Sequence, residues 1–203
     1  MSKTKRKLNK QLAMERQHWK YIKRHYPFLD QKTHWYTGKL LDKKERKNMP
    51  PLMTLESGDI PKGWVKCFGY ALSEELREEF IRCGCLDAVN IEQVKEKFGE
   101  LRIYFGGLPN GCRAEDIVDK YAALSQSVCI YCGSMDAYEI NIGGWLSPIC
   151  RECYNTRDFF ESYDKITEEK KKTETKELKE LKLHVAKQPH VNILPRRKRK
   201  GKK

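Results

Sequence analysis

Residues 129–153 read CIYCGSMDAYEINIGGWLSPICREC. It contains two Cys-x-x-Cys pairs, Cys129 with Cys132 and Cys150 with Cys153, and seventeen residues separate them. Two residues between thiolates let both sulfurs reach one tetrahedral ion, and two pairs at this separation are typical of zinc sites. The sequence therefore predicts one zinc ion held by all four cysteines.

The segment between the two pairs predicts a β-hairpin. Apolar and polar side chains alternate from Tyr138 to Ile142, and Gly143-Gly144 follows. The second pair then opens an amphipathic helix, expected from about Arg151 to Tyr163, whose N-terminus favours thiolates electrostatically. A knuckle, a hairpin and a helix that carries two ligands in its first turn form a treble-clef arrangement.

Because the protein supplies all four ligands, the predicted zinc is structural; a catalytic ion needs an open position. Two alternatives stay open: an iron–sulfur cluster uses the same ligands, or some of the thiols are buried without a metal. A redox Cys-x-x-Cys is less favoured, because such a site needs only one pair and the presence of a second matched pair would then be a coincidence.

Histidine placement bears on catalysis. Treble-clef nucleases need histidines in the hairpin and helix, but none lies between residues 35 and 183. The acidic residues of the body read instead as an exposed helix face: Glu74, Glu75, Glu78 and Glu79. The sequence therefore predicts a protein that is not an enzyme.

Composition limits the remaining classes. Of 203 residues, 39% are apolar and 34% are charged, so part of the chain is expected outside any core. No apolar run of about 18 residues exists, so we expect no membrane span, and the basic N-terminus does not resemble a secretory signal. Eight cysteines without such a signal favour a reducing compartment. We expect the cytoplasm of a bacterial or phage-infected cell, or the nucleus in a eukaryote.

Charge is unevenly distributed along the chain. The net charge of +13 divides into +11 for residues 1–50, −7 for residues 51–165 and +9 for residues 166–203. The sequence thus describes an acidic body with two basic arms, and only the arms favour nucleic acid.

These patterns predict five segments in an α+β fold, a small helix–hairpin–helix core followed by a treble-clef-like module with helical or disordered basic arms. They are a basic, partly helical arm (1–47), a linker (48–63), an α+β core (64–128), the four-cysteine zinc module packed on that core (129–165), and a charged helix with a disordered basic tail (166–203).

Within the core, the first helix is expected to begin at an N-cap, Ser73, and to end near Gly84. Its buried face would comprise Leu76, Phe80 and Ile81. Two strands, 89–94 and 101–105, and a second helix, 114–127, follow. The other cysteines, Cys67, Cys83, Cys85 and Cys112, read either as isolated thiols or as a second metal site.

The basic arms mix cationic and aromatic side chains, which can neutralise phosphates and stack on unpaired bases. We therefore expect contact with nucleic acid or a ribonucleoprotein. The candidate residues are Lys5, Arg6, Lys7, Lys10, Arg16, Trp19, Lys20, Lys23, Arg24, Arg196, Arg197, Lys198, Arg199 and Lys200. Alternatively, the apolar stripe of the first arm docks on the core or on another protein.

The stretch IEQVKEKFGELRIYF (91–105), followed by a helix, CIYCG, GGW and a Cys-x-x-Cys pair, resembles a family of small uncharacterised bacterial and bacteriophage proteins. The resemblance covers about residues 63–154 and implies domain limits and a prokaryotic or viral origin, with no activity attached. In that family the last ligand is often histidine, where this chain has Cys153. Its most specific segment carries Lys95, Lys97, Phe98, Arg102 and Tyr104, which would pair with helix carboxylates or form a recognition edge.

Two functional hypotheses follow. The first is a non-catalytic, zinc-binding, nucleic-acid-associated factor that uses its arms as phosphate clamps. The second is a protein-binding adaptor or inhibitor, such as a phage factor acting on a host complex, that meets its partner through the acidic body.

Overall fold

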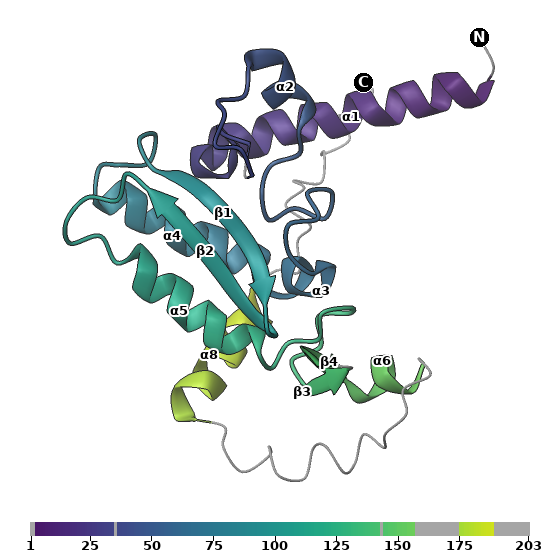
Figure 1. The fold of residues 1–203 in the computed structure, drawn as a ribbon, viewed down its shortest axis with the longest axis vertical. Helices are drawn as coiled ribbons and strands as arrows, with labels where there is room; N and C mark the ends of the chain where they lie inside the picture. The colour runs from purple at the N-terminus through teal and green to yellow at the C-terminus, as the bar shows by residue number, and fades with distance from the viewer. Residues whose placement is uncertain (1–2, 35, 143, 157–174, 189–203) are drawn as a thin grey trace, which may run out of the picture.

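A computed structural model describes residues 3–34, 36–142, 144–156 and 175–188 (Figure 1). The elements are α1 (Lys3–His25), the 3₁₀ turn η1 (Pro27–Leu29), α2 (Lys43–Asn48), α3 (Lys62–Trp64), the π-helical turn η2 (Val65–Gly69), α4 (Tyr70–Arg82), β1 (Asn90–Lys97), β2 (Glu100–Gly106), α5 (Ala114–Ser125), β3 (Ala137–Ile142), β4 (Trp145–Cys150), α6 (Arg151–Asn155) and α8 (Lys176–Lys187). Helices and two antiparallel hairpins together confirm the predicted α+β class.

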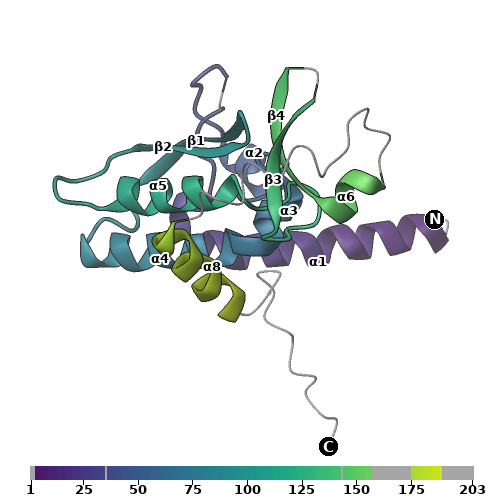
Figure 2. The same cartoon turned by 90° about the horizontal axis from the view of Figure 1, so that it is seen from below.

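The β1–β2 hairpin lies over α4 and α5, forming one sheet layer on one helical layer (Figures 1 and 2). Val94 pairs with Ile103 and both are buried, whereas the next pair, Lys95 and Arg102, lies on the outer face. The connecting turn has positive φ at Phe98 (55°) and Gly99 (76°). The expected hairpin is confirmed, with strands that extend further into the turn than the predicted ranges 89–94 and 101–105.

The first core helix begins earlier than its capping signal indicated. Ser73 is fully buried inside α4, and its hydroxyl donates a 2.7 Å hydrogen bond to the carbonyl of Gly69. Trp64, Phe68 and Leu72, four residues apart, are also fully buried, so a buried stripe extends the helical run upstream of the serine. The N-cap prediction at Ser73 is therefore wrong.

Burial corrects two other predictions for α4. Leu76 and Phe80 are buried as expected, but Ile81 is 50% exposed because the core contacts the opposite side of the helix. Glu79, expected on an exposed face, is buried against the segment that precedes α5.

The segment 48–63 is not a spacer. It has little regular structure, but Leu52, Met53 and Ile60 belong to the main core. The carboxylate of Asp59 folds it back by accepting a 2.8 Å hydrogen bond from the amide of Met53. A stretch whose prolines and glycines exclude a long helix can therefore still contribute buried side chains to the core.

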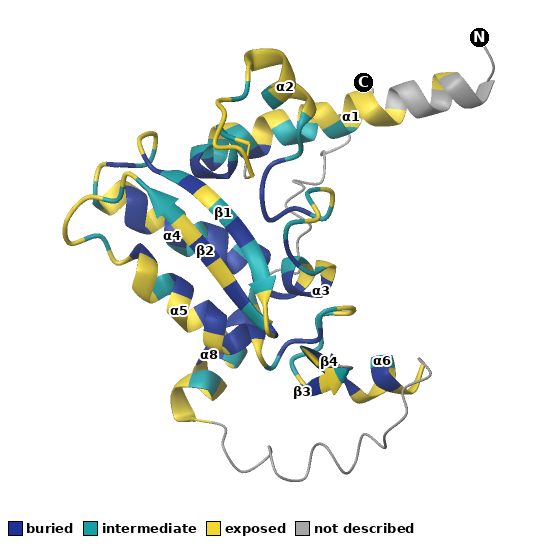
Figure 3. Ribbon diagram, in the orientation of Figure 1, coloured by how far each residue is buried: buried dark blue, intermediate teal, exposed yellow. Residues whose placement is uncertain are grey.

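Both arms also contribute to the core. Ile22 of α1 and Tyr26, which follows the helix, are buried, and Figure 3 shows dark blue at the end of this helix that meets the body. From α8, Leu181 and Val185 are buried against the same core. The C-terminal end of α1 and the apolar side of α8 are therefore anchored to the body, whereas Leu12 and Met14 on α1 are exposed.

Some predictions fall outside the described residues. The predicted third helix is observed only as α6, because residues 157–174 are not described. The expected disordered tail belongs to residues 189–203, which also lie outside the described part of the chain.

Candidate metal centre

Two segments, 129–132 and 150–153, bring four thiols together beside β4. The Sγ atoms of Cys129, Cys132, Cys150 and Cys153 all lie within 4.8 Å of one another, and those of Cys132 and Cys150 are 3.6 Å apart. Sulfurs at about 2.3 Å around a tetrahedral zinc stand about 3.8 Å apart. The donor set therefore fits one tetrahedral metal ion, as the spacing predicted.

The first pair sits on a tight knuckle. The amide of Gly133 donates a 3.0 Å hydrogen bond to the carbonyl of Cys129, and Gly133 has φ +87°, which side chains other than glycine rarely allow. The amide of Ser134 lies 3.4 Å from the sulfur of Cys132 and donates to it. These contacts aim both sulfurs toward the same point.

The second pair is delivered by the β3–β4 hairpin. The register pairs Ala137 with Cys150 and Ile142 with Trp145, which confirms the predicted hairpin. Cys150 ends β4 and caps α6, where its sulfur accepts a 3.5 Å hydrogen bond from the amide of Cys153. The hairpin thus brings the second pair back to the knuckle.

The thiols differ in acidity. At Cys129, burial is the strongest single influence and by itself would raise the pKa of the thiol. Hydrogen bonds from the backbone at Cys132, Cys150 and Tyr131 together outweigh burial, and the pKa is lowered to about 7. Burial raises the pKa of Cys150 and of Cys153 above the ordinary value for cysteine. A bound zinc would replace these protons, since thiolates are its ligands.

The cysteine module rests on the main core through backbone contacts. The amide of Gly63 donates a 3.0 Å hydrogen bond to the carbonyl of Ile130, and the indole N–H of Trp64 donates one of 2.9 Å to Val128. A Cβ built on Gly63 would lie 2.0 Å from the carbonyl oxygen of Cys129. Sequence reasoning missed the role of Gly63, because no local pattern marks a glycine that another segment approaches.

The predicted nucleic-acid residues are distributed unequally. On α1, Arg6, Arg16, Lys20 and Arg24 are exposed. Trp19 is partly buried, and Lys23 forms a 2.9 Å ion pair with Asp30. The predicted residues whose side chains are not described are Lys5, Lys7, Lys10, Arg196, Arg197, Lys198, Arg199 and Lys200. Because of its ion pair with Asp30, Lys23 serves to anchor α1.

The side chains of the hairpin motif interact with one another. The ammonium of Lys95 lies 5.0 Å from the ring centroid of Tyr104, and Arg102 forms a 2.7 Å ion pair with Glu100. In these contacts the partners come from the hairpin itself, not from helix carboxylates. Phe98 at the turn is 53% exposed.

The four remaining cysteines do not form one group. Cys67 lies near the knuckle, where its Cβ would be 3.4 Å from a Cβ placed on Gly133. Cys83 and Cys112 lie together beside Glu79, at the opposite end of α4. The four-member second site considered from sequence is therefore not assembled.

No family model matches the chain, and no curated protein or solved structure matches it significantly. Across the described residues, every helix is too short or too polar to cross a membrane.

Proposed function

We propose that this protein is a non-catalytic zinc-binding factor that associates with nucleic acid or a ribonucleoprotein through its basic segments. The observation that carries the zinc part is the convergence of Cys129, Cys132, Cys150 and Cys153 within 4.8 Å. With four protein ligands the ion has no open position, and its role is to hold the module together.

The module is proposed to be treble-clef-like. The knuckle at 129–133 supplies one pair of thiols, the β3–β4 hairpin follows, and the second pair stands at the start of α6. Among its described residues the module buries a cluster of only six, so metal binding would supply much of its folding free energy.

The nucleic-acid part rests on α1. Its N-terminal half extends away from the body while its C-terminal end is anchored to it (Figures 1 and 3). Arg16, Lys20 and Arg24 succeed one another at intervals of four residues and are exposed, so they share one face of the helix. Such a row matches the repeated charges of a phosphate backbone.

A salt-titrated binding measurement tests this proposal. Fluorescence anisotropy with single-stranded RNA, single-stranded DNA and duplex DNA is recorded from low to moderate salt for the full chain and for R16Q/K20Q/R24Q. The triple variant should bind more weakly. The plot of log K against log salt should become less steep by about 0.7 for each phosphate contact to a single strand that the variant loses.

The control removes the same charge elsewhere. K62Q/K66Q/K179Q alters three exposed lysines on α3, η2 and α8 and should retain the salt slope. No binding of the full chain at low salt would refute the nucleic-acid proposal, as would equal losses in the two triple variants.

A protein-binding adaptor is the second candidate. It is favoured by Met14 and Tyr21, which are 59% and 46% exposed and lie seven residues apart on one face of α1. Affinity purification after nuclease treatment separates the candidates: a stoichiometric protein that is lost with M14A/Y21A, but not with R16Q/K20Q/R24Q, would favour the adaptor.

A further inference from the structure

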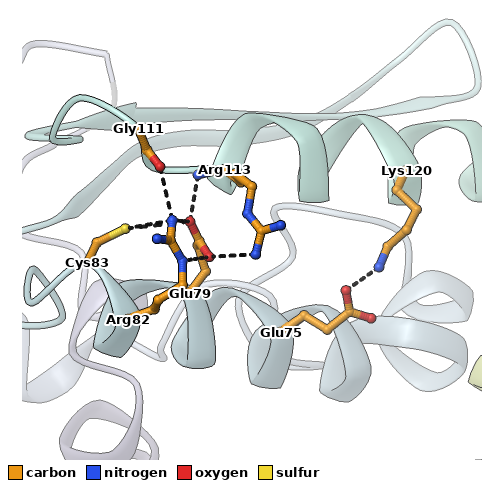
Figure 4. A network of polar contacts seen from close by, with 7 residues as sticks. All are labelled: Glu75, Glu79, Arg82, Cys83, Gly111, Arg113 and Lys120. Carbon is orange, nitrogen blue, oxygen red and sulfur yellow. Dashed lines mark hydrogen bonds and ion pairs between the residues drawn. The ribbon is translucent and has the colours of Figure 1, made fainter.

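The C-terminal end of α4 is tied to the loop that precedes α5. The guanidinium of Arg82 donates a 2.9 Å hydrogen bond to the carbonyl of Gly111, and the amide of Arg113 donates one of 2.6 Å to the carboxylate of Glu79. Figure 4 shows Arg82 and Arg113 both contacting the carboxylate of Glu79, while Gly111 contacts the guanidinium of Arg82. The residue between Gly111 and Arg113 is Cys112, and the residue after Arg82 is Cys83.

The two cysteines consequently face each other across this junction. Their sulfurs and a carboxylate oxygen of Glu79 all lie within 4.8 Å of one another. Both cysteines are half-buried, so a small solute can reach them. A disulfide requires sulfurs at about 2.05 Å, so only a short movement of side chains already held side by side is needed.

The guanidinium of Arg82 already contacts two members of this cluster, the carboxylate of Glu79 and the sulfur of Cys83. Arg82 donates to Glu79 through Nε at 2.7 Å, and its Nη2 atom lies 3.3 Å from the sulfur of Cys83. The guanidinium of Arg113 lies 3.6 Å from the same carboxylate. A metal would have to displace these partners, so the arrangement favours chemistry between the two thiols.

The two thiols differ in their surroundings. Burial, together with contacts to Cys112 and to the carboxylate of Glu79, raises the pKa of Cys83, and the positive charge of Arg82 offsets only part of that rise. Cys112 interacts with Cys83 on one side and with the buried thiol of Cys85 on the other. Of the two thiols, Cys83 is the one to which a guanidinium N–H donates, at 3.3 Å, so its thiolate is stabilised once it forms and Cys112 is placed to follow.

We propose that Cys83 and Cys112 are an oxidation site, which a hydroperoxide converts to a disulfide. The thiolate of Cys83 attacks one peroxide oxygen, the O–O bond breaks, and the departing oxygen takes a proton to leave as water or alcohol. The thiol of Cys112 then attacks the sulfenic sulfur, its proton leaving with the hydroxyl as water. Two thiols are oxidised and one peroxide is reduced.

The disulfide would join α4 to the start of α5 covalently. It would close a loop that contains the β1–β2 hairpin, whose exposed face carries Lys95, Arg102 and Tyr104. Closing a loop restricts the unfolded chain, so the oxidised protein should be the more stable form. This site is independent of the proposed function, since neither residue belongs to the metal centre or to α1.

Peptide mapping of the zinc-loaded full-length protein tests the proposal. The protein is treated with hydrogen peroxide, alkylated with N-ethylmaleimide and digested for mass spectrometry. We expect a Cys83–Cys112 peptide, loss of two alkylatable thiols per chain, full retention of zinc and reversal by dithiothreitol. The oxidised protein should also melt several degrees higher than the reduced one.

Three variants sharpen the result. C85A should still form the bond, C112A should leave a sulfenic acid on Cys83 that dimedone traps, and R82Q should slow oxidation several-fold. Absence of the peptide from the wild-type protein while zinc is retained would overturn the proposal. So would a second zinc per chain that is lost in C83A, because it would make the cluster a metal site.

Discussion

The amide of Gly63 donates a hydrogen bond to the carbonyl of Ile130, at 3.0 Å, and thereby joins the start of the core helices to the cysteine knuckle. The approach is close enough that a Cβ on Gly63 would lie 2.0 Å from one backbone oxygen and 2.7 Å from a backbone carbon of the knuckle. Neither atom belongs to a flexible side chain, so a substitution here must move the metal centre or the helix.

Gly63→Ala should accordingly destabilise the protein by about 1–3 kcal/mol, in the range of overpacked sites, and should weaken metal retention. The measurements are urea denaturation and competition with a colorimetric zinc chelator. Gly69→Ala is the matched control, because its Cβ would meet side-chain carbon at an ordinary 3.6 Å. Equal stability of the two variants would contradict the assigned close contact.

Cys132→Ser should release the metal and lower stability by about 4 kcal/mol or more, as losses of structural metals do. Metal analysis of the wild-type protein should find about one zinc per chain. Cys67→Ala removes a neighbouring thiol outside the ligand set and should retain the zinc. A wild-type protein that is folded and metal-free after purification would refute the metal centre.

Acid should weaken the junction at Glu79. Its hydrogen bond from Arg82, together with the amide of Arg113, lowers the pKa of this carboxyl from near 4.5 to about 2. Because the folded pKa is the lower one, the stabilisation is complete above pH 4.5 and is lost as the pH falls toward 2.

The measurement compares wild type with Glu79→Gln by denaturant unfolding at several pH values. The difference in unfolding free energy should be constant near neutral pH and shrink below pH 4.5; taking a difference cancels acid release of the metal. Glu78→Gln, at an exposed position on the same helix, serves as control. A pH-independent difference between wild type and Glu79→Gln would contradict this account.

Helix α8 should be an integral part of the folded protein. Leu181 is 8% exposed, so Leu181→Ala should cost about 2 kcal/mol or more in unfolding free energy. Leu183, on the same helix, is 57% exposed, and Leu183→Ala should change the free energy by less than about 0.5 kcal/mol. Thermal and urea unfolding of the pair decide whether α8 is docked in solution.

Sequence alone determined the features whose cause is local. The spacing of two Cys-x-x-Cys pairs identified all four ligand candidates, because the reach of a thiolate from a tight turn depends on neighbours along the chain. Two β-prone stretches identified the hairpin β1–β2, and the acidic first turn and apolar period of Ala114–Ser125 identified α5. These signals need no information about what packs against them.

Which parts of the chain share the core depends on contacts between segments that are distant in sequence. Charge, proline and glycine predicted basic arms and a linker at 48–63, with docking of the first arm on the core as an alternative; in the structure Ile22, Met53 and Val185 are fully buried. Burial depends on distant partners, so a few apolar side chains can anchor a charged segment. The same reason applies to Cys83 and Cys112, which lie far apart in the sequence: their proximity, like that of Gly63 to Ile130, exists only because the helices and the hairpin pack together.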